Sequence, residues 1–109
     1  MIIQKHLNIE LIIVNDASTD DSLDIINSMI NTNDHRIKLI NNATNMQLPI
    51  SLNLGHSMAR GRYITWISHD NLFHTNAIYE MVRTIQKSEA DIVFCNYETI
   101  NKSGKIIDR

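Results

Sequence analysis

The feature that most constrains the fold of this chain is an alternation of short apolar runs with segments of helical spacing. Four runs rich in β-branched or aromatic residues predict strands at 11–14, 37–40, 63–67 and 91–95. Apolar residues recur at helical spacing between successive runs, which predicts one helix in each interval. This order predicts an α/β fold with a mainly parallel sheet and helices packed on its faces. Residues 102–105 are typical of a hairpin turn.

The residues around the predicted helices indicate where each helix begins or ends. Ser18 or Thr19 is expected to cap the first helix, because short hydroxyl side chains accept hydrogen bonds from free backbone N–H groups. Gly61 is expected to end the second helix. Thr75 or Asn76 is expected to cap the third.

The overall composition limits the classes of protein to consider. The 109 residues allow one domain, covering 1–109, and the net charge of −2 gives no reason to expect a nucleic-acid partner. The single cysteine, Cys95, excludes an internal disulfide and fits a reducing compartment. We expect Cys95 to pack within its strand, and Tyr63 and Trp66 to lie in the core or on a sheet face. A cytoplasmic domain is therefore expected, with membrane association of a longer parent protein left open.

The predicted sheet is narrow for strands as apolar as residues 11–14. A strand of this kind is usually covered on both faces and flanked by neighbours. We therefore expect further strands, either supplied by another copy in a homo-oligomer or lost by truncation. A small, complete α/β domain is the alternative that composition leaves open.

Two polar clusters follow predicted strands, at 15–20 and 68–71. Ligands of open α/β sheets bind beyond the carboxyl ends of the strands. In the first cluster, Asp16 could accept a hydrogen bond from a nucleobase or a sugar hydroxyl, next to a helix N-terminus that favours phosphate. The alternative is that Asp16, Ser18 and Asp20 only cap the following helix.

The second cluster offers candidate metal ligands. Asp70 could bind Mg²⁺ or Mn²⁺, which prefer oxygen ligands, and His69 is the neighbouring candidate. The alternative is an ordinary turn formed by Asp70 and Asn71. Arg60 could contact a phosphate or lie in solvent. A receiver-like signalling domain also has acidic residues at strand ends, but the run at 91–95 lacks the lysine that such a domain needs after a later strand.

Several segments, in one register, resemble the family 2 glycosyltransferases, which have the GT-A fold. Residues 10–22, ELIIVNDASTDDS, are similar to the family's apolar strand followed by V-[DN]-D-G-S-T-D-x-S. Asn45 and the stretch from 53 to 64 resemble the family's N-x-G…N-x-G…A-x-G-x-Y-I. Residues 66–71, WISHDN, fall where the family carries its D-x-D signature. The chain is thus identified as a partial GT-A domain, truncated at both ends.

The resemblance implies a donor site and a reaction. Asp16, with Asn15, Ser18 and Arg60, would bind a nucleotide-diphosphate sugar, usually a uridine diphosphate sugar. Asp70 would contact the divalent metal. The reaction would be an inverting transfer to a hydroxyl of a glycan acceptor, commonly in polysaccharide or cell-envelope glycan synthesis.

The chain also departs from the family pattern. Ala17 and Gln47 replace family glycines, which is mild only where the backbone does not need a positive φ. Asn15 stands where many members have Asp, and Ser68 and His69 stand where an acidic partner of Asp70 is expected.

Two parts of the family pattern have no counterpart in this sequence. The segment that would match the first family strand is missing, and so is the acceptor half with its catalytic carboxylate. No general base is therefore assigned, although Glu98 and Asp108 are late carboxylates. The alternatives to an enzyme are a non-catalytic nucleotide-binding module and an inactive remnant.

Overall fold

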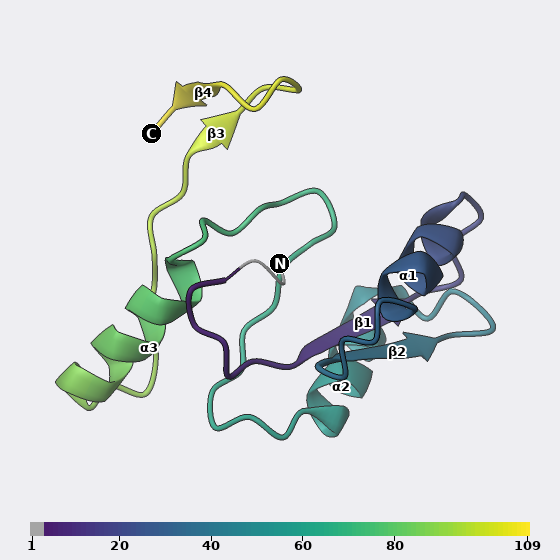
Figure 1. Ribbon diagram of the computed structural model, residues 1–109, viewed down its shortest axis with the longest axis horizontal. Helices are drawn as coiled ribbons and strands as arrows, with labels where there is room; N and C mark the ends of the chain where they lie inside the picture. Colours follow the sequence, from purple (N-terminus) through teal and green to yellow (C-terminus); the bar gives the residue numbers. More distant parts are fainter. Residues whose placement is uncertain (1–3) are drawn as a thin grey trace.

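The computed structural model describes residues 4–109 and has the predicted α/β character (Figure 1). Its helices and strands, in chain order, are β1 (Leu11–Asn15), α1 (Ser22–Ile30), β2 (Ile37–Asn41), α2 (Gln47–Met58), α3 (Ala77–Ser88), β3 (Thr99–Ile100) and β4 (Ile106–Asp108). No helix in the described part of the chain is long and apolar enough to cross a membrane.

The centre of the fold is the parallel pair of β1 and β2, connected through α1. The register aligns Leu11 with Ile37 and Asn15 with Asn41, so the two strands begin and end together. Helix α2 packs against β1, and a Cβ at Gly55 would lie 3.5 Å from Cγ2 of Val14. The first two predicted strands are therefore confirmed, and both end at the same edge of the sheet.

The carboxylate of Glu10 joins three segments at the opposite edge, where β1 begins. Its Oε2 accepts a hydrogen bond from Nζ of Lys38 in β2 at 2.9 Å. Its Oε1 accepts hydrogen bonds from the backbone N–H groups of Arg60 and Gly61, the latter at 3.0 Å. The bond from Lys38, followed by that from Arg60, lowers the pKa of Glu10 from 4.5 to about 2.

The strands predicted at 63–67 and 91–95 are wrong. Both segments are irregular, and neither pairs with another strand among residues 4–109. Trp66 is 52% exposed, and Tyr63 and Cys95 are exposed as well, so the packing expected of these three residues is also wrong. Phe94, in the second segment, is 89% exposed. Strand propensity reflects packing against neighbours, so an apolar run without a neighbouring strand does not form a ladder.

The helix ends differ from two of the predictions. Helix α1 begins at Ser22, whose N–H donates to Oδ1 of Asp20 at 3.0 Å, so Ser18 and Thr19 lie before the helix start. Helix α2 ends at Met58 and is followed by extended backbone at Ala59, so Gly61 does not end it. Asn76 occupies the N-cap position of α3, one of the two alternatives predicted, but its side chain makes no capping hydrogen bond.

The predicted hairpin turn at 102–105 is confirmed. It joins β3 to β4 in an antiparallel pair. Oδ1 of Asn101 accepts hydrogen bonds from the N–H groups of Ser103 and Lys105, each at 3.0 Å. Gly104 has a φ of +81°, which a glycine adopts without strain.

The first described residues, Gln4 and Lys5, are anchored on the start of α3. Gln4 is buried, and its Nε2 donates to the carbonyl of His74 at 3.0 Å. The N–H of Lys5 donates to the carbonyl of Thr75 at 2.9 Å, and its ammonium lies 4.1 Å from the ring centre of Tyr79. These contacts tie the start of the described chain to the start of α3.

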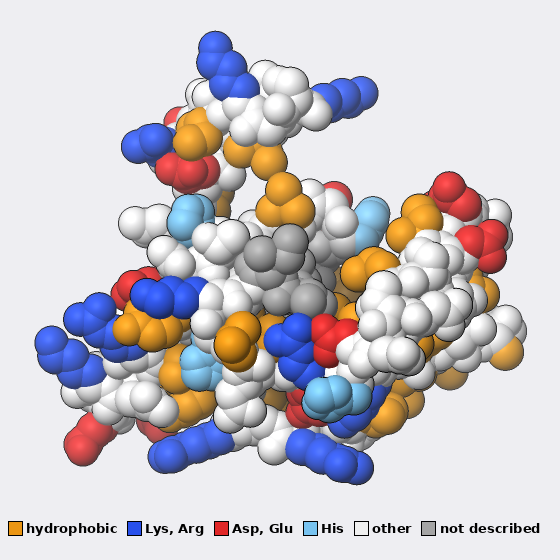
Figure 2. Space-filling model, in the orientation of Figure 1, with side chains coloured by type: hydrophobic (Ala, Val, Ile, Leu, Met, Phe, Trp, Pro, Cys, Tyr) orange, Lys and Arg blue, Asp and Glu red, His pale blue; other side chains and the backbone are white. Residues whose placement is uncertain are grey.

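Apolar burial is sparse. Among residues 4–109, Ile85 is the one buried hydrophobic residue, and it is still 9% exposed. Hydrophobic side chains are accordingly visible over several parts of the surface (Figure 2). Further strands that would cover such surface stay a prediction.

Replacement of Glu10 by glutamine is expected to remove part of the pH dependence of stability. Because the folded-state pKa of Glu10 is lowered, its contribution is full above its unfolded pKa and is lost as pH falls through about 2. Chemical unfolding should show Glu10→Gln to be less stable than wild type at neutral pH, with a difference that shrinks toward about pH 2. Glu80→Gln, an exposed control on α3, should change stability far less. A difference between wild type and Glu10→Gln that stays constant with pH would contradict this assignment.

Candidate functional site

Asp16 lies where the ends of β1 and β2 meet the start of α2. Its Oδ1 accepts hydrogen bonds from Nδ2 of Asn42 at 2.9 Å and from the backbone N–H of Met46 at 2.7 Å. The bond from Asn42, followed by that from Met46, lowers the pKa of Asp16, so the carboxylate is ionised at neutral pH. The alternative hypothesis, that Asp16 only caps α1, is therefore wrong. The carboxylate instead binds at the N-terminus of α2, where the helix dipole favours negative charge.

Asn15 is buried, with 4% of its surface exposed, and both ends of its amide are bonded within the protein. Its Nδ2 donates to Oδ1 of Asn41 at 2.7 Å. Its Oδ1 accepts hydrogen bonds from the hydroxyl and the N–H of Ser18. Asn15 thus fixes the loop that follows β1, while Ser18 is exposed and its hydroxyl oxygen can still accept a hydrogen bond.

Two residues beside Asp16 have left-handed backbone. Ala17 has a φ of 58° and Gln47 a φ of 67°. Both stand where the family pattern has glycine, so the local backbone does need a positive φ at these positions. The backbone at Ala17 and Gln47 is therefore strained, because a Cβ disfavours the left-handed region. The two substitutions are not mild.

Asp70 and His69 lie in an exposed turn closed by the N–H of Asn71 and the carbonyl of Ser68, 3.2 Å apart. Hydrogen bonds from Ser22 lower the pKa of Asp20, and a smaller charge effect of His69 acts in the same direction.

The donor set at Asp70 and His69 fits only one kind of metal site. No group of three or more His, Cys, Asp or Glu side chains gathers to hold a metal within the described residues. A Mg²⁺ site commonly uses one or two carboxylates and completes its shell with substrate phosphates and water. Asp70 and His69 fit that arrangement, and do not fit a cage made by the protein alone.

Arg60 lies away from Asp16. Its backbone is held by Glu10 before the start of β1, whereas Asp16 follows the end of that five-residue strand. The structure therefore brings Asp16, Asn15 and Ser18 together and leaves Arg60 at the other edge of the sheet. The expectation that Arg60 joins them at a donor site is corrected accordingly.

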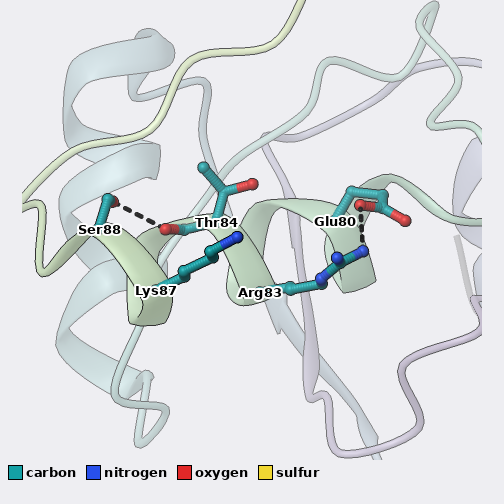
Figure 3. A pocket seen from close by; sticks show the side chains of 5 residues that line it. All are labelled: Glu80, Arg83, Thr84, Lys87 and Ser88. Atoms are coloured by element: carbon teal, nitrogen blue, oxygen red, sulfur yellow. Dashed lines mark hydrogen bonds and ion pairs between the residues drawn. The ribbon is translucent and has the colours of Figure 1, made fainter.

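A surface groove on α3 is unrelated to these residues (Figure 3). It has a volume of about 460 Å³ and is lined by Glu80, Arg83, Thr84, Lys87 and Ser88. All five belong to a single helix, and Glu80 pairs with Arg83 at 3.7 Å, as in an ordinary solvated helix face. The groove therefore gives no reason to place a ligand there.

Sequence reasoning missed the partners of Asp16. Asn42 stands among several polar residues of a turn-like segment, and its spacing from Asp16 carries no motif. The signal that could have found it is strand register: with Asn15 opposite Asn41, the residues that follow them, Asp16 and Asn42, also meet.

Comparisons with known proteins point to one family. The profile described as Glycosyl transferase family 2 matches residues 2–109. The chain is 32% identical over 100 residues to the glycosyltransferase GlyG of Streptococcus pneumoniae serotype 4, covering 92% of the chain and 33% of GlyG. It is 32% identical over 104 residues to an uncharacterized glycosyltransferase of Haemophilus influenzae, covering 95% of the chain and 41% of that protein. The chain thus spans well under half the length of these relatives.

Ala17→Gly is expected to stabilise the protein. Glycine removes the strain of the left-handed backbone, so the free energy of unfolding should rise by about 1 kcal/mol. Ala43→Gly is the matched control, since Ala43 is also in a loop but is not among the residues with positive φ. That control should lose about 0.5 kcal/mol, because glycine makes the unfolded chain more flexible. Denaturant unfolding distinguishes the two, and a loss of stability in Ala17→Gly would contradict the strain.

Proposed function

Because the chain belongs to glycosyl transferase family 2, we propose that it carries the donor-nucleotide site of an enzyme that transfers a sugar from a nucleotide-diphosphate sugar to an acceptor hydroxyl. The activity and substrates of the whole protein are part of this proposal, since the chain spans a third of the length of GlyG.

The observation that carries the proposal is the ionised carboxylate of Asp16 at the binding edge of the sheet. Its Oδ1 accepts hydrogen bonds from Asn42 and Met46, and Gln47 and Ser51 also help to lower its pKa. Since the direct hydrogen bonds described go to Oδ1, we take Oδ2 as the oxygen that accepts from a ligand. A uracil ring offers an N–H donor of the required kind, and a ribose offers hydroxyl donors. A uridine diphosphate sugar is therefore the proposed donor, with Ser18 as a further contact from the same loop.

Asp70 and His69 are the proposed residues for holding a divalent cation together with the diphosphate. Mg²⁺ or Mn²⁺ bound there would offset the negative charge of the departing nucleoside diphosphate. The exposure of both side chains supports access by a ligand.

The acceptor is proposed to be a glycan hydroxyl that attacks the anomeric carbon with inversion, in polysaccharide or cell-envelope glycan synthesis. No residue of this chain is assigned as general base. Among the late carboxylates, Glu98 pairs with Nε of Arg109 at 3.2 Å on an exposed hairpin.

A cytoplasmic location is proposed because the free thiol of Cys95 is exposed, as is ordinary in a reducing compartment.

A titration of uridine diphosphate into the purified chain, with and without Mn²⁺, tests this function. Asp16→Asn is expected to weaken binding about tenfold or more, because it removes a charged acceptor. Asp70→Asn should abolish the increase in affinity that Mn²⁺ gives. Asp24→Asn, an exposed position on α1, should bind like wild type.

Calorimetry gives the dissociation constants, and circular dichroism confirms that each variant is folded. Failure of folded wild-type protein to bind uridine diphosphate would contradict a donor site in this chain. Equal affinity of wild type and Asp16→Asn would contradict the role of Asp16.

A further inference from the structure

The two asparagines at the end of β2 each bond to one residue at the end of β1. Oδ1 of Asn41 accepts from Nδ2 of Asn15 at 2.7 Å, and Nδ2 of Asn42 donates to Oδ1 of Asp16 at 2.9 Å. The first bond lies inside the protein, since Asn15 is 4% exposed. The second reaches the carboxylate of the candidate site. Neighbouring, chemically identical side chains therefore serve different partners.

Asn42 also connects Asp16 to the helix that covers β1. Its Nδ2 lies 3.5 Å from Oγ of Ser51, which is 8% exposed on α2. The same Oδ1 of Asp16 accepts from the N–H of Met46 at the start of α2. The carboxylate is thus held by one donor from the end of β2 and another from the start of α2.

Two donors on one oxygen restrict how the carboxylate can turn. The terminal torsion of an aspartate is broad and roughly two-fold, so a free carboxylate readily exchanges its two oxygens. Removal of Asn42 would take away the donor that lowers the pKa of Asp16 most, and would leave the N–H of Met46 on Oδ1 with smaller contributions from the N–H of Gln47 and the hydroxyl of Ser51. The neighbouring Gln47 is itself strained, with a φ of 67°, so the backbone donor alone is a weak support.

We propose that Asn42 is a positioning residue, which holds Oδ1 of Asp16 so that Oδ2 is presented to the donor nucleotide. The inference rests on the proposed function in one respect, namely that Asp16 binds the nucleotide. The geometry of the ligand-free carboxylate is independent of that function and is tested separately below.

The experiment compares Asn42→Ala with Asn41→Ala in the purified chain. Carbon-detected NMR follows the titration of the Asp16 carboxyl group, and calorimetry gives the affinity for uridine diphosphate. In Asn42→Ala, Asp16 should titrate at higher pH than in wild type, because a hydrogen bond to its charged form is lost. Affinity for uridine diphosphate should fall about tenfold. Asn42→Gln, which keeps the amide donor, should recover part of both.

Asn41→Ala is the control for disturbance of the fold. It leaves the buried amide of Asn15 without its partner, so it should lower stability while the titration of Asp16 stays as in wild type. An Asp16 titration that is the same in wild type and Asn42→Ala would overturn the proposal. So would equal displacement of that titration by Asn41→Ala and Asn42→Ala.

The two hypotheses fail in different ways. If wild type does not bind uridine diphosphate, the proposed function fails, and the NMR titration alone decides whether Asn42 holds Asp16. If wild type binds and Asn42→Ala binds equally well, the function stands and the positioning role falls. If Asn42→Ala does not fold, Asn42→Gln and Asn42→Ser are compared instead. The proposal would be overturned if Asp16 titrates in Asn42→Ser, which lacks the amide, as it does in wild type.

Discussion

The parallel pairing of β1 with β2 is the constraint on which the candidate site depends. Because the strands are in register from Leu11 and Ile37 to Asn15 and Asn41, they end together and bring Asp16 beside Asn42. Helix α2 packs on β1, and the N–H of Met46 at its N-cap donates to the same carboxylate. Without that pairing, nothing would hold the loop after β1 in a fixed position relative to the end of β2 and the start of α2.

Two carboxylates at opposite ends of β1 show how the same chemistry serves different roles. Both Glu10 and Asp16 have lowered pKa values because neutral or positive donors bind the charged form. Glu10 uses both oxygens, one for Lys38 and one for two backbone N–H groups, so it is fully engaged in holding the fold. Asp16 uses Oδ1 for the fold, and its Oδ2 is the oxygen proposed to accept from a ligand. That difference, more than charge or burial, separates the structural carboxylate from the proposed functional one.

The sequence was sufficient where local pattern and tertiary contacts agree. Leu11–Val14 and Ile37–Ile40 form strands because each has the other as a neighbour. The role of Asp16, which the family motif suggested, stays a prediction. The runs at 63–67 and 91–95 have similar composition but no strand beside them in the described residues, so propensity alone misled. Glu10 and Asn42 were missed because their partners are 28 and 26 positions away, which no local spacing can reveal. The donor, the metal and the oligomeric state stay predictions, since they concern molecules outside this chain.

The central claim is that Asp16 presents a free carboxylate oxygen to a nucleotide while its other oxygen is held by Asn42 and α2. A crystal structure of the chain with uridine diphosphate tests this most directly. The account predicts Oδ2 of Asp16 within about 3 Å of a base N–H or a ribose hydroxyl. Oδ1 should remain on Asn42 and the N–H of Met46. A nucleotide bound elsewhere, or bound at this edge with Asp16 turned away from it, would contradict the account.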